Sequence, residues 1–229
     1  MTKQFLLAAV VGLAASASAS AALVCGWTIP TAVAAATTGS NFTYGAADQG
    51  ELTAGTSLSG FHTLAAATWS SPAGNGSSFS LSVNNWSAGD YFQISCSTTG
   101  YADPISFSFD QTRSATGPAT FDVLMSTDGG STFSTVLAGY SVVQAGLAGT
   151  GTSSWNATTN QPTAFTTTVS GLTAAANQAS VIFRIQSTVT TAAGGTNRID
   201  NVQVNSGAVP SPGAIALVGL AGLVARRRR

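Results

Sequence analysis

Polar and apolar residues alternate in short stretches along the middle of this chain. The clearest are 78–83, which reads S-F-S-L-S-V, and 105–109, which reads I-S-F-S-F. A period of two places successive side chains on opposite faces of a β-strand, so each stretch predicts a strand with one buried face. Less regular stretches predict further strands at 91–94, 121–125, 131–136, 140–143, 165–169, 181–186 and 199–204.

Glycine-rich turns separate these stretches. They read S-P-A-G-N-G at 71–76, S-A-G-D at 87–90, A-T-G-P at 115–118, D-G-G at 128–130 and A-G-G-T at 193–196. Short strands with turn residues at regular intervals are typical of antiparallel β-sandwiches. The pattern therefore predicts an all-β fold, an antiparallel jelly-roll-like β-sandwich.

The N-terminus reads as a secretory signal peptide. Lys3 precedes an apolar stretch at 5–15, and small residues follow in the order A-S-A-S-A-S-A-A. A basic start, a short apolar helix and an A-x-A site are the parts of such a signal, and we expect cleavage at Ala21. The alternative, a permanent N-terminal anchor, is disfavoured because the apolar stretch is short.

The C-terminus carries a second apolar segment, which predicts a short helix at 213–225. A helix of this length spans only ~20 Å, against the ~30 Å of a bilayer's hydrocarbon core. Basic residues follow this helix, and the positive-inside tendency predicts that they lie on the cytoplasmic side of the membrane. We expect a transient membrane anchor, with a permanent single span as the alternative. The predicted division is a signal peptide at 1–21, a sandwich domain at 22–207 and an anchor segment at 208–229.

Removing both ends changes the charge balance. The chain has equal numbers of basic and acidic residues, but only Arg113, Arg184 and Arg198 among the basic ones lie in the central domain, together with all eight acidic residues. Phosphate binding needs clustered lysine or arginine. The sequence therefore argues against nucleic acid as a partner.

Two cysteines, Cys25 and Cys96, occur in a chain that is expected to be exported. In an oxidising compartment such a pair predicts a disulfide. Two buried free thiols are the alternative.

The segment S-T-D-G-G-S-T-F at 126–133 resembles the Asp-box hairpin found in sialidase-type propellers. In that turn an aspartate accepts local backbone hydrogen bonds, a glycine takes a positive φ and the aromatic residue packs inward. A propeller repeats the box several times, and this chain has it once. We expect a structural hairpin here.

Candidate catalytic residues are few. His62 is the only histidine, it has no nucleophile motif, and one histidine with two cysteines does not make a common zinc site. We therefore expect a protein that is not an enzyme. The alternative is a secreted carbohydrate-active hydrolase that uses two carboxylates.

We expect no organic cofactor, and calcium is the one metal that the sequence suggests. Asp48, Glu51 and Asp200 lie in oxygen-rich segments, and hard oxygen ligands are what calcium takes. The alternative is that these residues cap or bridge backbone groups.

Aromatic rings that stack on sugars offer another function. Trp155 lies in a polar loop, T-S-S-W-N-A-T-T-N, and Trp86 and Tyr101 also lie among polar residues. We take these three as candidate glycan contacts. Burial in the core is the competing interpretation, above all for Trp86, because large aromatics carry much of a sandwich's burial.

The tail itself resembles a PEP-CTERM sorting signal, with a proline-glycine start, an apolar helix and an arginine cluster. The residues that carry the resemblance are Pro210, Ser211, Pro212, Gly213, Arg226, Arg227, Arg228 and Arg229. Ser211 stands where the family usually has glutamate. The resemblance implies passage through the export machinery, processing by an exosortase-like enzyme and delivery to the cell surface or extracellular matrix. It suggests a structural or adhesive protein that binds extracellular polysaccharide weakly.

Overall fold

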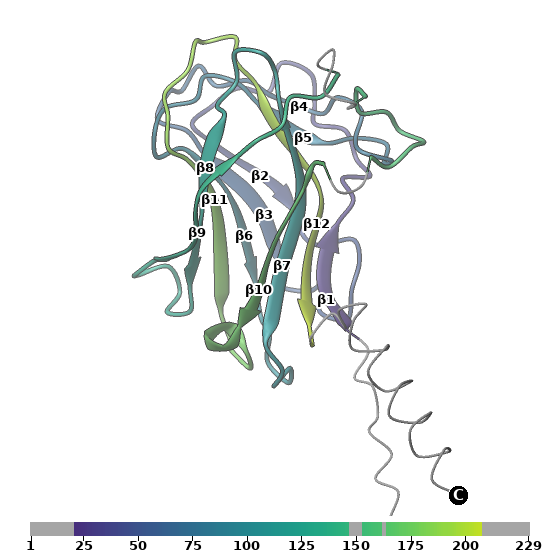
Figure 1. Ribbon diagram of the computed structural model, residues 1–229, viewed down its shortest axis with the longest axis vertical. Helices are drawn as coiled ribbons and strands as arrows, with labels where there is room; N and C mark the ends of the chain where they lie inside the picture. Colours follow the sequence, from purple (N-terminus) through teal and green to yellow (C-terminus); the bar gives the residue numbers. More distant parts are fainter. Residues whose placement is uncertain (1–20, 147–152, 162–163, 208–229) are drawn as a thin grey trace, which may run out of the picture.

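A computed structural model describes residues 21–146, 153–161 and 164–207, and these residues form a β-sandwich (Figure 1). They contain twelve strands in two antiparallel sheets and one short 3-10 helix, Thr173–Ala175. The predicted all-β fold is confirmed. The predicted signal helix and C-terminal apolar helix lie outside the described residues, as does the sorting motif. Nowhere in the described part of the chain is there a helix long and apolar enough to cross a membrane.

The first sheet is built around β12, the last strand. On one side β12 pairs with β7, and β10 forms the edge beyond it. On the other side its two halves have different partners, since β5 pairs with its start and β1 with its end. The strands are β1 (Ala22–Trp27), β4 (Trp69–Ser70), β5 (Leu81–Val83), β7 (Ile105–Arg113), β10 (Thr166–Leu172) and β12 (Asn197–Ser206).

The second sheet has the order β2-β3-β6-β11-β8-β9. Its central strands alternate strictly between buried and half-exposed residues, so one face packs on the core and the other meets solvent. The strands are β2 (Asn41–Gly45), β3 (Ser57–Phe61), β6 (Tyr91–Cys96), β8 (Thr120–Ser126), β9 (Ser134–Ser141) and β11 (Val181–Ser187).

Aromatic side chains fill the space between the sheets. Phe107 of the first sheet stacks on Phe183 of the second, with ring centroids 4.3 Å apart and planes 3° from parallel. Near one end of the sandwich, Trp86 makes edge contacts with Phe92 and Phe121. All five residues are fully buried. Offset and edge-on ring pairs of this kind add to the free energy gained from burial alone.

Two details differ from the sequence prediction. The stretches 131–136 and 140–143 were predicted as separate strands, but 134–141 is one strand, β9, that passes through Gly139 with φ +61°. Register shifts along its pairing with β8 absorb the irregularity, and Asp122 Oδ1 accepts a hydrogen bond from the Gly139 N–H. The sequence pattern also missed β1, β2, β3 and β4.

Candidate functional site

The solvent-facing side of the second sheet gathers rings and hydrogen-bonding side chains from strands far apart in the sequence. Across the sheet, Phe61 of β3 lies opposite Tyr91 of β6, and Tyr91 lies opposite Gln186 of β11. In the next row, Gln93 of β6 lies opposite Arg184 of β11. All are half-buried or exposed, in contrast to their fully buried strand neighbours.

Three of these outward side chains, Phe61, Tyr91 and Arg184, form a continuous stack with Phe133 of the hairpin before β9, and we call these four residues the platform. Phe61 stacks on Tyr91 with centroids 5.6 Å apart, and Phe61 is 36% exposed. The Arg184 guanidinium carbon lies 4.1 Å from the Tyr91 ring centroid and 3.9 Å from that of Phe133. Arg184 is therefore held between two aromatic rings, each a cation–π contact.

A further contact fixes the direction of the guanidinium. Arg184 Nε donates a 2.8 Å hydrogen bond to Gln93 Oε1, its cross-strand neighbour. With Nε engaged and both faces stacked, the group has little rotational freedom left. Its Nη atoms have no hydrogen bond to any described residue, and no described carboxylate lies within ion-pair distance of it.

The hairpin at 126–133 supplies the fourth platform residue. Asp128 Oδ1 accepts hydrogen bonds from Thr132 N and Ser126 Oγ, and Oδ2 accepts one from Thr132 Oγ1. These bonds, chiefly those from Thr132, hold the pKa of the exposed Asp128 well below its usual value. The predicted structural hairpin is confirmed, but the aromatic residue does not pack into the core. Phe133 lies on Arg184 at the surface.

The three residues that the sequence suggested as glycan contacts lie outside the platform, and the prediction is wrong for two of them, Trp86 and Trp155. Trp86 is fully buried in the core, and Trp155 is only 4% exposed, packed edge-on against Phe165 with Arg198 over its ring. Tyr101 is half-buried and donates a 2.7 Å hydrogen bond to Glu51 Oε2, which raises the pKa of Tyr101 to about 12. Trp155 is buried because the Phe165 ring and the Arg198 side chain cover it.

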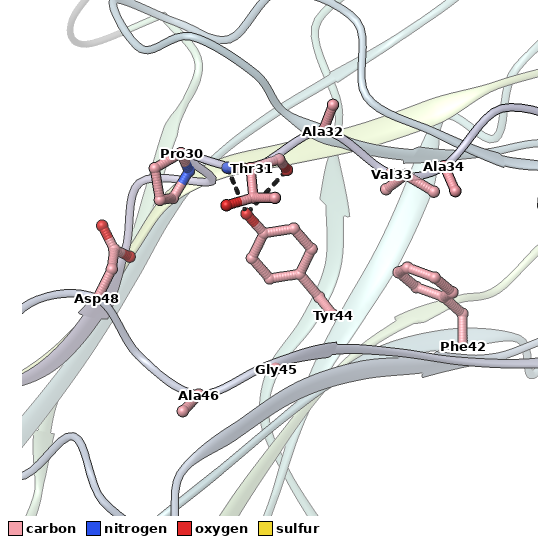
Figure 2. A pocket seen from close by; sticks show the side chains of 10 residues that line it. All are labelled: Pro30, Thr31, Ala32, Val33, Ala34, Phe42, Tyr44, Gly45, Ala46 and Asp48. Atoms are coloured by element: carbon pink, nitrogen blue, oxygen red, sulfur yellow. Dashed lines mark hydrogen bonds between the residues drawn. The ribbon is translucent and has the colours of Figure 1, made fainter.

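A surface hollow of about 380 Å³ lies between the segment after β1 and strand β2 (Figure 2). Its polar groups are already paired with one another. The Tyr44 hydroxyl both accepts from Thr31 N and donates to Thr31 O at 3.0 Å, and Asp48 accepts two hydrogen bonds from Thr28. Because these groups are satisfied internally, the hollow offers a ligand fewer free partners than the platform does.

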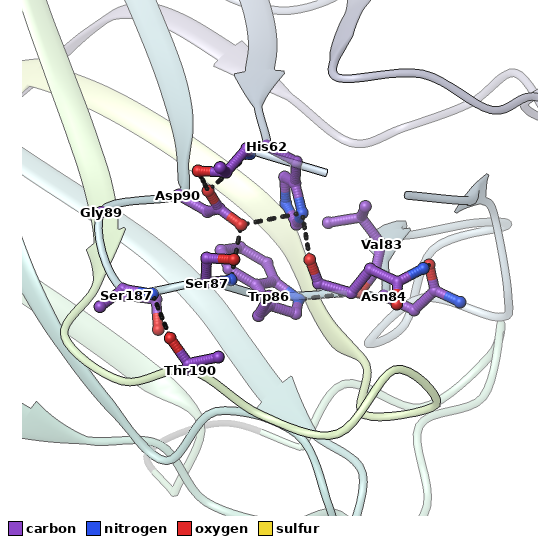
Figure 3. Close-up of polar contacts among 12 residues, drawn as sticks. His62, Val83, Asn84, Trp86, Ser87, Gly89, Asp90, Ser187 and Thr190 are labelled. Atoms are coloured by element: carbon purple, nitrogen blue, oxygen red, sulfur yellow. Dashed lines mark hydrogen bonds and ion pairs between the residues drawn. The ribbon is translucent and has the colours of Figure 1, made fainter. Parts of the chain in front are cut away.

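His62 is buried rather than catalytic (Figure 3). Its Nδ1 lies 3.4 Å from Asp90 Oδ2 and 3.3 Å from the Asn85 carbonyl oxygen, and its ring packs edge-on against Trp86 and Trp69. Burial lowers the pKa of His62, although Asp90 opposes the shift. Neither side chain is exposed, so neither can reach a substrate.

The three predicted calcium ligands are not brought together. Asp48 is held by Thr28, Glu51 by Tyr101, and Asp200 by Asn75 N and Ser77 Oγ. Within the described ranges, no three histidine, cysteine, aspartate or glutamate side chains are grouped so that they could hold a metal ion. Their contacts agree with the competing interpretation, in which each acid accepts hydrogen bonds from nearby groups.

Asp200 faces a second acid that the sequence did not single out. It lies directly opposite Asp110 in the pairing of β12 with β7, and both are buried. Asn75 connects them, since its N–H donates to Asp200 Oδ2 and its Nδ2 donates to Asp110 Oδ2. Asp200 Oδ1 is buried and has no hydrogen-bond partner. Burial, reinforced by the charge of Asp110, raises the pKa of Asp200 to about 6.

The shifted pKa of Asp200 predicts a pH dependence of stability. Its folded pKa lies above its unfolded value of 3.8, so the ionised form is disfavoured in the fold and protonation stabilises it. The wild type should gain unfolding free energy relative to Asp200→Asn as the pH falls through about 6 toward 4, by at most about 3 kcal/mol. Urea unfolding of both proteins from pH 7.5 to 4.5, with EDTA present, measures this. A constant difference between them would refute the assignment.

The two cysteines meet in the core. Cys25 on β1 and Cys96 on β6 belong to different sheets, and both thiols are buried and free in the structure. Interaction with the Cys96 side chain, followed by burial, raises the pKa of the Cys25 thiol far above its usual value. The sulfurs are neighbours, and the disulfide stays a prediction.

No protein-family profile matches this sequence, and neither does any curated protein. Among solved structures, the chain is similar to the CBM22-1–CBM22-2 tandem domain of Xyn10C from Paenibacillus barcinonensis, at 14% identity over 85% of this chain with a TM-score of 0.43. This chain spans 50% of that tandem domain.

Two other solved structures are similar. The K3 cleaved adhesin domain of Lys-gingipain from Porphyromonas gingivalis has 17% identity, covering 81% of this chain and all of that one, with a TM-score of 0.43. The TmCBM61 module in complex with β-1,4-galactotriose has 10% identity, covering 67% and 90%, with a TM-score of 0.39. At such identities none of these similarities provides a residue-by-residue correspondence.

Proposed function

We propose that this chain is a non-catalytic protein of the cell surface or extracellular matrix that binds polysaccharide weakly through the platform. The observation that carries the proposal is the surface stack of Phe61, Tyr91, Arg184 and Phe133, in which Phe61 is exposed and the other three side chains are half-buried. An apolar ring that stays at the surface forgoes the free energy of burial, about 25 cal/mol for each Å² left in contact with water. A ligand that covers the rings recovers part of that free energy.

The residues around the platform suit a sugar. The C–H face of a pyranose ring matches a flat aromatic ring, and its hydroxyls need donors and acceptors at the ring's edge. Gln93 and Gln186 are half-exposed beside Tyr91. Gln93 Oε1 accepts from Arg184 and Gln186 Nε2 donates to the Gly89 carbonyl oxygen, so the Gln93 amide N–H groups and Gln186 Oε1 remain for a sugar. The sheet presents a surface rather than a deep pocket, so few contacts form and we expect weak affinity for a single sugar chain.

The proposed localisation of the protein rests on its two terminal segments. We infer export through the signal peptide and sorting through the C-terminal segment, with an exosortase-like enzyme as the processing partner and the membrane as a temporary attachment. One observation supports the N-terminal boundary, because β1 begins at Ala22, directly after the expected cleavage at Ala21. A mature chain cut there would retain all the strands that the structure describes.

The alternative function, a hydrolase with two carboxylates, finds no support in the acidic pair that the fold creates. Asp110 and Asp200 are 3% and 0% exposed and are covered by the segment around Asn75. A glycosidase needs both carboxyl groups beside a bound sugar, with access for water. This pair therefore has a structural role.

A polysaccharide panel tests the proposal. In affinity electrophoresis of the purified chain with soluble neutral and acidic polysaccharides, we expect at least one to retard the wild type. Tyr91→Ala should weaken that interaction about 10- to 30-fold, the effect of removing a central aromatic contact. Tyr91→Phe keeps the ring and should keep most of the affinity, and Tyr101→Phe should change nothing. Retardation by no polysaccharide, or equal retardation of Tyr91→Ala, would count against the proposal.

A further inference from the structure

The arginines of the sandwich lack acidic partners. Arg113, Arg184 and Arg198 share the domain with eight acidic residues, yet none of the three lies within ion-pair distance of a described carboxylate. Arg113 donates to the carbonyl oxygens of Val142, Ser114 and Ala115, and Arg198 donates to that of Ala73. Only the guanidinium of Arg184 lies on the platform.

Arg184 is prepared for an anion in three ways. Its faces are covered by Tyr91 and Phe133, its Nε is held by Gln93, and its Nη atoms have no hydrogen-bond partner among the described residues. A fixed guanidinium presents parallel N–H groups that match the two oxygens of a carboxylate. The entropy of ordering a long side chain, which weakens most surface ion pairs, has already been lost here.

Nearby acids do not compete for this role. Asp122 is the acid on the same face of the central strands, where it lies opposite Gln186, one row away from Arg184. Its Oδ1 accepts the hydrogen bond of Gly139 N. An anionic ligand at Arg184 would therefore meet one cation and would not displace an internal salt bridge.

We propose that the platform selects an acidic polysaccharide in which uronate units alternate with neutral sugars. This inference rests on the proposed glycan-binding function and names its substrate class. One carboxylate would bind the Nη edge of Arg184 while a neighbouring neutral sugar packs on Phe61, the exposed ring at the end of the stack. The spacing matters because the surrounding domain is acidic, and a polymer charged at every unit would bring further anions against it.

The number of cations on the platform favours a mixed acidic polysaccharide over nucleic acid. A nucleic acid carries a phosphate at each nucleotide, and its binding depends on several cations that release counterions together. The platform offers one arginine and no lysine. We therefore expect binding to fall only about tenfold for a tenfold rise in salt, as one ion pair predicts.

Polysaccharides and their carboxyl-reduced forms test the inference, with hyaluronan and xanthan as the probes. The purified chain should bind at least one of them about tenfold more tightly than its carboxyl-reduced form, the effect of one charge-assisted contact. Arg184→Gln should remove the preference by weakening binding of the acidic form alone. Arg184→Lys should restore it only in part, because a lysine ammonium is not a planar fork.

The outcomes separate this inference from the proposed function. If the wild type binds the acidic and reduced forms equally, or if Arg184→Gln keeps the preference for the acidic form, the inference is wrong. In that case, weaker binding of both forms by Tyr91→Ala would still support glycan binding. If the wild type binds no probe and no neutral polysaccharide, both are wrong. Tighter binding of a thymidine oligonucleotide than of either acidic polysaccharide would also overturn the inference.

Discussion

Replacing Phe183 by alanine should lower the free energy of unfolding by about 3–5 kcal/mol. The ring stacks on Phe107 at 4.3 Å across the sandwich and is fully buried, so its removal both loses burial and leaves a cavity between the sheets. The strands on either side are fixed by their ladders and cannot close that cavity without shifting register.

Urea denaturation followed by tryptophan fluorescence measures this change as a lower midpoint with an unchanged slope. Ser95→Ala is a suitable control, since Ser95 lies on the solvent-facing side of β6, in the strand paired with β11. It should alter the free energy of unfolding by less than about 0.5 kcal/mol. A loss below about 1 kcal/mol for Phe183→Ala would mean that the two sheets do not pack as described.

Oxidation of Cys25 and Cys96 should stabilise the protein by about 4 kcal/mol, because a bond between them closes a long loop in the unfolded chain. Both thiols are buried in the hydrophobic core, and the Cys96 side chain raises the pKa of Cys25, so the two side chains lie near each other before oxidation. Protein isolated without reductant should show no reactive thiols after denaturation, and dithiothreitol should lower its midpoint of unfolding.

The double variant Cys25→Ala, Cys96→Ala is the control, since reductant should leave its stability unchanged. Two reactive thiols in the denatured wild type, with no effect of reductant on its stability, would show that the buried pair stays reduced.

Strand alternation predicted most of the second half of the fold. The strands β6, β7, β8, β11 and β12 overlap stretches with several polar–apolar alternations. The missed strands at the start of the chain are short, two to six residues, so their side chains give few alternations to recognise. In β1 the pattern is absent because four consecutive residues are buried. β9 was split because a glycine inside a strand reads as a turn.

The candidate site was harder to predict than the fold. Tyr91, Gln93 and Arg184 alternate with buried residues, so their outward direction was visible in the sequence. Their meeting was not, because it depends on the pairing of β6 with β11, about ninety positions apart. Exposed tryptophans were favoured instead, but Trp86 lies in the core and Trp155 is buried between Phe165 and Arg198. The available signal was an arginine between phenylalanine and isoleucine, the single charged residue of its strand in an otherwise acidic domain.

A map of where a sugar chain touches the protein tests the central claim most directly. In ¹H–¹⁵N spectra recorded while hyaluronan oligosaccharide is added, we expect shifts concentrated on β3, β6 and β11, at Phe61, Tyr91, Gln93 and the Arg184 side-chain Nε–H. The hollow beside Tyr44 and the first sheet should stay unchanged. Shifts centred on that hollow or on the first sheet, with the platform signals unmoved, would contradict the account.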